Sequence, residues 1–268
     1  MDLRQFANDI KRRSELLAEV VSASKSLLWN SPHAIEHLNY IQGRLTNKEI
    51  KKYNVGWFPS NNNINILFDY ISEATVNELN LVYDYMIKNR GHFDLIKRSF
   101  FHFHNLIIPL IDDYGNIITL AGRTIIDEDE QKNLKIKKYK NAPFKKQLHL
   151  FGLNEASKTI ESKDSVIIVE GQFDCIKCHQ IGLLNTVALT GSDLSMQQIF
   201  ILKRKTNNFY LLMDNDKAGE RAVEKVIKNY SKFINIKTIK LPKQYNDVDS
   251  FIVKSTDKEI KNNFQSYF

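Results

Sequence analysis

The sequence predicts an α/β protein, in which a mixed α+β N-terminal subdomain precedes a domain with a mainly parallel β-sheet flanked by helices. From residue 165 onward, short apolar runs alternate with helical stretches. This alternation is typical of parallel sheets with right-handed crossovers. Before that point, helical patterns extend to about residue 100, and two β-rich runs joined by a polar turn follow them.

The composition indicates a folded protein with a preference for polyanions. With 268 residues, 43% of them hydrophobic, the chain can form one large domain or two ordinary ones. The formal net charge of +7 favours association with nucleic acid or nucleotide phosphates. Two cysteines, a polar start and no apolar run near the roughly 18 residues of a membrane span indicate a protein that stays inside the cell and off the membrane.

The first hundred residues contain four helical patterns. Residues 2–28 carry apolar side chains at helical spacing, which predicts one amphipathic helix, either continuous or broken once. A serine followed by proline opens a second helix over 32–42, and Gly43 is a typical stop. Capping boxes at residues 46–49 and 75–78 predict two more short helices.

The centre of the chain is expected to be β-rich. Residues 106–126 form two apolar runs around a polar turn at 112–116, which predicts a hairpin. The lysine-rich stretch at 132–153 has few periodic apolar residues and is expected to be loop with a short strand.

Beyond residue 165, four strands and three helices alternate. The strands are expected at 166–169, 186–189, 209–213 and 236–241. The helices are expected up to Ile181, from Ser195 onward, and over 217–230. Such sheets bind ligands beyond the carboxyl ends of their strands.

Carboxylates recur where these predicted strands end. Glu170 directly follows the first strand and Asp214 the third, so both are expected at the carboxyl edge of the sheet. Like charges at close range repel and lose hydration, and a divalent metal ion is the simplest neutralising partner. The six carboxylates of this pattern are Glu170, Asp174, Asp214, Asp216, Asp247 and Asp249.

The spacing of these carboxylates resembles the Toprim domain of DnaG-type primases, a domain shared with topoisomerases and some nucleases. A V-E-G-x-x-D element is present at 169–174, and a D-x-D element with a small-residue helix start is present at 214–219. The third acidic element, usually D-P-D, is present at 247–249, with Val248 in place of the proline.

The upstream sequence resembles the primase core in particular. Four stretches match in order, at 34–59, 107–125, 138–143 and 150–156, and several ordered motifs are more specific than any single one. The resemblance covers roughly residues 34–253.

This resemblance implies a nucleotidyltransferase that joins NTPs into short RNA primers on a single-stranded DNA template. The implied cofactors are two Mg²⁺ or Mn²⁺ ions, which stabilise charge on the attacking and leaving oxygens. The catalytic residues and principal metal ligands would be Glu170, Asp214 and Asp216. The other three carboxylates would complete a second metal site or surround the first.

Basic and polar residues are candidates for holding the triphosphate and the template. Arg123 is the first of them, because a guanidinium binds phosphate with two hydrogen bonds and the family has a basic residue there. Tyr139 offers a ring on which a base can stack. The full candidate set is Arg123, Lys138, Tyr139, Asn141, Lys145 and Lys146.

Some features of the family have no counterpart here. We expect no initial zinc ribbon and no structural zinc, and we expect no helicase-binding domain after Val253. We therefore expect a minimal polymerase core in the cytoplasm of a bacterial cell or a phage-infected host. Asn105 stands where the family has a basic residue, so one phosphate or template contact is absent or supplied from elsewhere.

The expected organisation has four parts, and the expected partners follow from the family. The partners are single-stranded DNA, NTPs and the RNA–DNA hybrid product, with a replicative helicase and a separate zinc-ribbon protein as candidates in trans. The parts are an N-terminal helical segment at 1–30, an α+β subdomain at 31–162, the Toprim domain at 163–254 and a C-terminal tail at 255–268.

Other interpretations compete with this one. A Toprim-type nuclease would use the same acidic cluster but leaves residues 138–143 unexplained, and a single-strand-binding adaptor would have no use for clustered negative charge. Asp216 can simply cap the helix that starts at Lys217, and the lysines of 132–146 can form a solvated loop. The C-x-x-C pair at 175–178 has no second ligand pair at suitable spacing, which favours ordinary packing.

Overall fold

The computed structural model describes residues 3–87, 94–95 and 100–267. None of the helices in these ranges is both long enough and apolar enough to cross a membrane.

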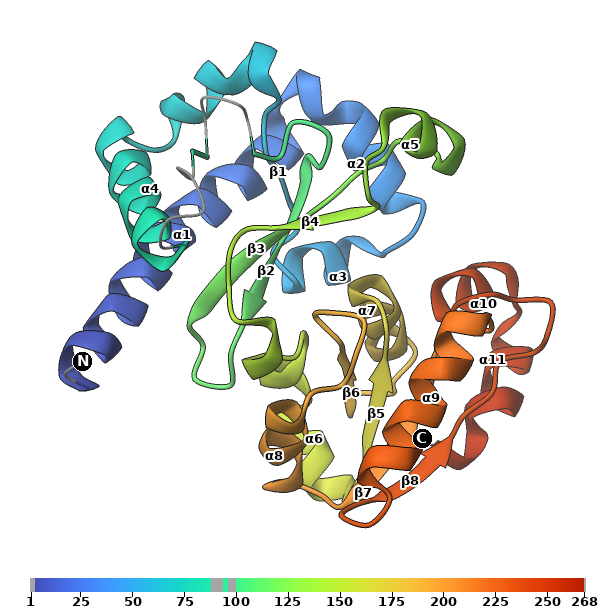
Figure 1. Ribbon diagram of the computed structural model, residues 1–268. Helices are drawn as coiled ribbons and strands as arrows, with labels where there is room; N and C mark the ends of the chain where they lie inside the picture. Colours follow the sequence, from blue (N-terminus) through green and yellow to red (C-terminus); the bar gives the residue numbers. More distant parts are fainter. Residues whose placement is uncertain (1–2, 88–93, 96–99, 268) are drawn as a thin grey trace. The chain divides into compact units, whose positions relative to one another are not determined.

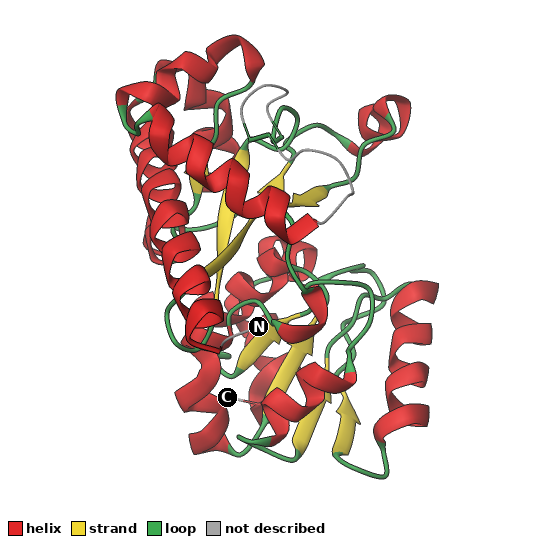
Figure 2. Ribbon diagram, turned by 60° about the vertical axis from the view of Figure 1, so that its left-hand side comes forward, coloured by secondary structure: helices red, strands yellow, loops and turns green. Residues whose placement is uncertain are grey.

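The chain forms two compact units, each with its own four-stranded sheet (Figures 1 and 2). Unit 1 consists of residues 1–111 and 116–144, and unit 2 consists of residues 112–115 and 145–268. The expected fold class, a mixed α+β subdomain followed by a domain with a parallel sheet, is confirmed.

Unit 1 is built on an antiparallel sheet with the strand order β1-β2-β3-β4. The predicted hairpin is confirmed, because β2 and β3 pair along their length and turn at 112–116. Gly115 in this turn has φ +87°, a conformation that glycine adopts without steric cost. The strands are β1 (Gly56–Trp57), β2 (Leu106–Ile111), β3 (Ile117–Arg123) and β4 (Tyr139–Asn141).

Helices cover this sheet. Helix α1 (Leu3–Asn30) contacts β1 and β3, and it is continuous, which confirms the predicted helix except for residue 2, which lies outside the described residues. Its buried side chains include Leu17, Val20 and Leu27, at the spacing of one helix face. The other helical elements of unit 1 are η1 (Pro32–Ala34), α2 (Ile35–Gln42), α3 (Asn47–Lys52), η2 (Asn61–Asp69), α4 (Glu73–Ile87) and α5 (Glu128–Leu134).

Two of the predicted helix starts are confirmed. Ser31 caps the second helix through its side chain, which accepts a hydrogen bond from the amide of His33, although the first turn is a 3₁₀ turn. Gly43 ends α2, and the Thr46 side chain caps α3 by accepting from the amide of Glu49.

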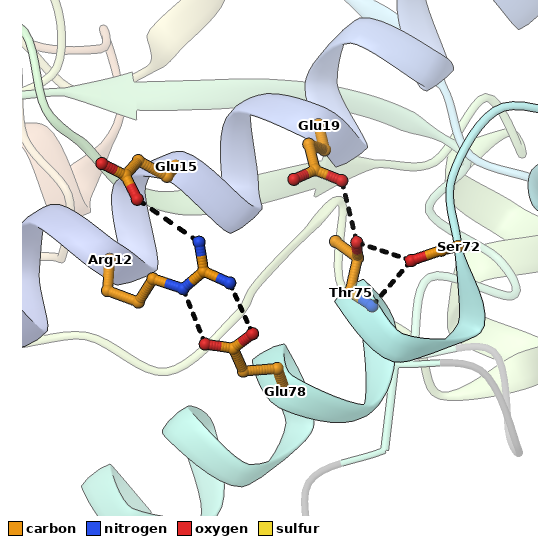
Figure 3. Close-up of polar contacts among 6 residues, drawn as sticks. All are labelled: Arg12, Glu15, Glu19, Ser72, Thr75 and Glu78. Atoms are coloured by element: carbon orange, nitrogen blue, oxygen red, sulfur yellow. Dashed lines mark hydrogen bonds and ion pairs between the residues drawn. The ribbon is translucent and has the colours of Figure 1, made fainter.

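The capping box predicted at Thr75 is wrong. Helix α4 begins before it, and the side chain of Ser72 accepts from the Thr75 amide at 3.1 Å. The side chains of the predicted box bind residues of α1 instead. The hydroxyl of Thr75 donates a hydrogen bond to the carboxylate of Glu19 at 2.8 Å (Figure 3). The Glu78 carboxylate binds Arg12 with two hydrogen bonds of 2.7 and 2.6 Å (Figure 3). A tertiary contact between α1 and α4 thus replaces the expected local cap.

The lysine-rich stretch at 132–153 departs in part from the expected loop. The predicted short strand is present as β4, but helix α5 extends to Leu134. Asp127 caps this helix by accepting from the amides of Asp129 and Glu130, and three acidic residues occupy its first turn. The cap and the helix dipole therefore stabilise a helix that buries no apolar face.

Unit 2 is built on a parallel sheet with the strand order β6-β5-β7-β8, as the alternating pattern predicted. Side chains from one face of this sheet pack with α6, α8 and α9 in a common core, while α7 contacts β5 and β6. The central strand β5 is buried throughout. The elements are α6 (Leu153–Lys163), β5 (Val166–Val169), α7 (Gln172–Gln180), β6 (Thr186–Ala188), α8 (Met196–Lys203), β7 (Asn208–Leu211), α9 (Lys217–Tyr230) and β8 (Asn235–Thr238).

The C-terminal segment is helical. Helices α10 (Val248–Lys254) and α11 (Asp257–Phe264) are followed by the turn η4 (Gln265–Tyr267). Phe264 is fully buried, and its ring lies 5.8 Å from that of Phe251.

The two compact units meet in sequence at 144/145, whereas the expected boundary between subdomain and Toprim domain lies at 162/163. Helix α6 accounts for the difference, because its buried residues Leu153, Ala156 and Ile160 belong to the core of unit 2. The functional division at 162/163 stays a prediction.

Candidate metal and nucleic-acid sites

The carboxyl edge of the parallel sheet brings Glu170 and Asp214 together. Strands β5 and β7 are paired in parallel, with Ile168 beside Leu211, so their ends lie side by side. Glu170 directly follows β5, and its Oε1 accepts a hydrogen bond from the backbone amide of Asp214 at 3.2 Å. The expected meeting of these two residues at one edge is therefore present.

Asp214 is the carboxylate of this edge on which the charges of the other carboxylates act. Burial, followed by the negative charges of Asp174, Glu170, Asp247 and Asp216, raises its pKa to about 8. The pKa of Glu170 is also raised, first by burial and then by the charge of Asp216, against the hydrogen bond from Asp214. Five of the six predicted carboxylates therefore act on one another, as like charges do in a shared site.

Asp216 has the capping role that competed with the metal role. Its Oδ1 accepts from the amides of Ala218 at 2.8 Å and Gly219 at 2.7 Å, at the start of α9. The carboxylate nevertheless stays exposed. A Cβ on Gly219 would lie 2.2 Å from the carbonyl oxygen of Asp214, so only glycine lets the helix start this close to the strand end. The cap fixes the carboxylate beside Asp214 and does not remove it from the edge.

Asp174 and Asp249 lie deeper than the others. They are 8% and 6% exposed, and the backbone amide of Asp249 donates to Asp174 Oδ1 at 3.0 Å. A Cβ on Gly171 would lie 2.3 Å from Asp174 Oδ2, which explains the glycine that follows Glu170. Asp174 thus holds the first turn of α10 against α7.

Asp247 is the N-cap of α10, and its side chain accepts from the amide of Ser250 at 2.7 Å. Val248, which stands where the family usually has proline, is buried at the first position of this helix. The substitution therefore leaves an ordered turn with both flanking carboxylates in place.

The chemistry of this edge suits a hard divalent cation. Its donors are carboxylate oxygens, and a cation would stabilise the ionised form of Asp214 against the burial and the neighbouring negative charges that raise its pKa. No group of three His, Cys, Asp or Glu residues in the described ranges is already assembled as a metal-ligand set. Mg²⁺ keeps several waters and substrate oxygens, so it does not require a closed protein cage. Which of the carboxylates would hold it stays a prediction.

Cys175 and Cys178 are thiols that are fully buried in α7. Cys175 Sγ lies 3.4 Å from the carbonyl oxygen of Thr186, and the Nε2 of His179 lies 2.8 Å from the same oxygen. The cysteines therefore pack between α7 and β6, as expected.

Arg123, the first candidate for a phosphate contact, is buried in unit 1 and 3% exposed. Its guanidinium donates to the hydroxyl of Tyr40 at 3.0 and 3.3 Å and to the hydroxyl of Tyr139 at 2.5 Å. Both rings also face the guanidinium, with centroids 5.9 and 5.2 Å from its carbon. Burial opposes the charge, but the two tyrosines more than offset this effect, so the pKa of Arg123 lies above its usual value. Sequence reasoning missed Tyr40, and the phosphate contact of Arg123 stays a prediction.

The candidates around β4 lie beside a cavity of about 380 Å³. Tyr139, Lys140 and Phe100 line this cavity. The Nζ of Lys140 lies 4.0 Å from the centroid of the Phe100 ring. Lys138 is exposed and Asn141 is half-buried. These residues give a mixed aromatic and basic surface of the kind that binds nucleic-acid bases and phosphates.

His102 and His104 lie in the turn that precedes β2. His104 is buried, and its Nε2 lies 2.7 Å from the carbonyl oxygen of Lys137. Burial lowers the pKa of His104, which favours the neutral ring.

Asn105 has a structural role. Its side-chain amide donates to the carbonyl oxygen of Phe58 at 2.9 Å, and its own carbonyl accepts from the Phe58 amide at 2.7 Å. The asparagine thus joins the end of β1 to the start of β2.

Lys145 and Lys146 belong to unit 2, in contrast to the other basic candidates. They lie at the turn η3 (Lys146–Leu148), and both side chains are exposed.

A parallel sheet with clustered carboxylates at its carboxyl edge, preceded by an antiparallel α+β unit, defines a Toprim-like catalytic core. Family models agree with each part: "Toprim-like" matches residues 167–252, and "DNA primase catalytic core, N-terminal domain" matches residues 24–157, half of the chain. The chain belongs to the DnaG-type DNA primase family.

Individual relatives are similar over most of this chain. A DNA primase of Staphylococcus epidermidis is 31% identical over 232 residues, which is 84% of this chain and 36% of the relative. A DNA primase of Aquifex aeolicus is 30% identical over 270 residues, which is 97% of this chain and 50% of the relative. The chain thus spans half or less of the length of these two relatives.

Solved structures share the fold. The crystal structure of the zinc-binding and RNA polymerase domains of the Aquifex aeolicus primase has a TM-score of 0.74 and 27% identity, over 99% of this chain and 63% of that one. A DnaG primase catalytic domain bound to single-stranded DNA has a TM-score of 0.73 over 97% of this chain and 80% of that one; its 23% identity supports the fold alone.

Proposed function

We propose that this chain is a primase polymerase core that joins NTPs into short RNA primers on a single-stranded DNA template. The observation that carries the proposal is the acidic edge of unit 2, where four other carboxylates act on a half-buried Asp214. A binding surface for nucleic acid has no use for such a cluster, whereas nucleotidyl transfer requires divalent cations.

The principal metal ligands in this proposal are Glu170, Asp214 and Asp216. When bound, two Mg²⁺ or Mn²⁺ ions would stabilise charge on the attacking and leaving oxygens. The protein's part is to hold the carboxylates: the Asp214 amide orients Glu170, and the start of α9 orients Asp216. The more deeply placed Asp174, together with Asp247 and Asp249, would surround these ligands.

Basic and aromatic residues would hold the substrates. Lys138, Asn141 and Tyr139 would contact the template or the primer hybrid near β4, and Arg123 would act at its phosphates or through Tyr139. Lys145 and Lys146 would contact phosphates from unit 2. The net charge of +7 supports polyanion binding, and a DnaG relative of the same fold was solved with single-stranded DNA.

The proposal extends to the cellular setting. The protein would act in the cytoplasm of a bacterial cell or a phage-infected host. A replicative helicase and a separate zinc-ribbon protein would supply, in trans, the functions of the parts that this chain does not match.

A primer-synthesis assay tests the proposal. The protein is incubated with single-stranded DNA, labelled NTPs and either Mg²⁺ or Mn²⁺, and the products are separated by length. Short RNA products are expected. Shortened DNA without RNA would instead support a Toprim-type nuclease, and neither product would support a single-strand-binding adaptor.

Asp214→Ala tests the metal assignment in the same assay. We expect synthesis to fall at least about a hundredfold, because the central ligand is lost, while the affinity for single-stranded DNA is retained. Glu161→Ala is the matched control, because Glu161 is an exposed carboxylate of unit 2 paired with Lys205 outside the acidic edge. Unaltered synthesis by Asp214→Ala would remove this residue from the site.

A further inference from the structure

The turn at 145–149 is fastened to unit 2 by buried side chains. Thr190 Oγ1 lies 2.9 Å from the carbonyl oxygen of Lys146 and 3.0 Å from that of His149, and its single hydroxyl hydrogen is shared between them. Gln198 Nε2 donates to the same two oxygens at 3.2 and 2.7 Å. Three donor hydrogens thus hold the carbonyl oxygens of Lys146 and His149.

Ser195 completes this arrangement. Its hydroxyl donates to the carbonyl oxygen of Gln147 at 2.8 Å and accepts from the Gln198 amide at 3.0 Å. Gln198 Oε1 accepts in return from the Ser195 amide at 2.9 Å, so a capping box of α8 holds both side chains in one orientation. Gln198 is 1% exposed and Thr190 is 7% exposed. We call Thr190, Ser195 and Gln198 the clamp.

The clamp lies at the same sheet edge as the carboxylates. Strand β6 ends at Ala188, and Ala188 pairs with Val169, the residue directly before Glu170. Neighbouring strands are about 4.8 Å apart, so the loop after β6 and the start of the acidic edge are adjacent. A Cβ on Gly191 in this loop would lie 3.9 Å from Lys146 Cδ, which places the lysine side chain against the loop.

The clamp acts on the backbone of a turn whose own side chains are solvated. Lys145 and Lys146 are exposed. Ordering a lysine costs side-chain entropy, and fixing the backbone from which it projects limits the conformations that remain to be lost on binding. Lysines that project from a fixed turn at the carboxylate edge of the sheet suit a ligand that carries its own negative charge, because such a ligand can bind both the proposed metal ions and the lysines.

We propose that Thr190, Ser195 and Gln198 are positioning residues that set Lys146, with Lys145 beside it, to bind phosphate at the rim of the acidic edge. This inference rests on the proposed function, because it deepens the description of the same site. The phosphates are those of the incoming NTP or those of the template strand. Two measurements distinguish these sources.

The test compares Thr190→Val, which loses the hydroxyl at nearly constant shape, with Thr190→Ser, which keeps it. The affinity for ATP with a fluorescent ribose label is measured in the presence of Mg²⁺, and the affinity for a labelled single-stranded DNA is measured separately. Thr190→Val should weaken one of the two affinities about tenfold, and Thr190→Ser should restore it. Loss for the nucleotide identifies the NTP as the source, and loss for DNA identifies the template.

Lys146→Met keeps the test valid if the clamp variant is poorly folded, because Lys146 is exposed. It should produce the same weakening as Thr190→Val, and the double variant should be no weaker than either single variant, since both changes act through one side chain. Additive losses, or wild-type affinities for both ligands in Lys146→Met, would overturn the proposal. Binding is measured without synthesis, so a wild-type protein that binds nucleotide through the clamp yet makes no primer would count against the proposed function alone.

Discussion

The two units differ in the partners of their buried ionisable groups. In unit 1, the buried guanidinium of Arg123 donates to the hydroxyls of Tyr40 and Tyr139, and burial lowers the pKa values of His37 and His104. In unit 2, burial and then the charges of neighbouring carboxylates raise the pKa of Asp214. Hydrogen bonds to neutral groups offset part of the cost of burying a single charge, whereas clustered like charges repel one another until a cation binds. We therefore assign the proposed metal chemistry to unit 2.

The largest effect is expected from Gly219→Ala in unit 2. The added Cβ would meet the carbonyl oxygen of Asp214, so the start of α9 must move and take Asp216 with it. We expect a loss of about 1–3 kcal/mol in the free energy of unfolding, measured by chemical denaturation, together with a severe loss of primer synthesis.

The control for this substitution is Gly43→Ala in unit 1. Gly43 has φ −68°, and its nearest neighbour would lie 3.5 Å from the new Cβ. This variant should be neutral or slightly more stable. Equal behaviour of the two alanine variants would contradict the claim that the close approach at Asp214 requires glycine.

Arg123→Met tests whether the buried charge of unit 1 is structural. Removing the guanidinium leaves the hydroxyls of Tyr40 and Tyr139 without this donor, and we expect a loss of about 1–3 kcal/mol in the free energy of unfolding. Tryptophan fluorescence reports this unit alone, because Trp29 and Trp57 are the two tryptophans of the chain and both lie in unit 1. A stable variant with impaired nucleotide use would instead favour a direct phosphate contact.

The sequence predicted the parallel sheet and the meeting of Glu170 with Asp214, because both follow from local rules. Apolar strands alternate with helices, and residues after parallel strands share one edge. The predicted bounds of α9 also match the structure, since Asp216 caps the helix within the same segment.

Contacts between distant segments account for what the sequence did not predict. The partner of Arg123 is Tyr40, 83 residues away, and the partner of Thr75 is Glu19, 56 residues away. No periodicity or cap pattern encodes such pairs. The clamp was missed for the same reason, because Gln198 binds carbonyls that lie 49 and 52 residues earlier in the chain.

The pH dependence of stability should have opposite signs in the two units. The Asp214 pKa of about 8 in the fold exceeds the ordinary value of 3.8, so the stability contributed by its bound proton is fully present below pH 3.8 and is lost as the pH rises through 8. Without divalent metal, unit 2 should therefore lose stability over this range. Asp214→Asn should remove this loss, which thermal unfolding in EDTA followed by circular dichroism would measure.

In unit 1, burial lowers the pKa values of His37 and His104 below 6.5. The unfolded chain then takes up protons first as the pH falls, so stability is present above pH 6.5 and is lost below it. Tryptophan fluorescence should show lower thermal stability at acidic pH, and His37→Gln should lessen this dependence. If the stability of both units changed with pH in the same direction, the predicted difference between the two units would be wrong.

The smallest effect is expected at the exposed contact between α1 and α4. Glu78→Gln removes the charge that Arg12 binds, but both side chains are about half exposed, at 41% and 51%. Solvent screens such pairs, so the melting temperature should not change measurably and should not depend on salt. Thr75→Val, at a site 9% exposed, removes a hydrogen bond to Glu19 and should cost about 1 kcal/mol. If Glu78→Gln proved the more costly of the two, charge rather than burial would determine stability in unit 1.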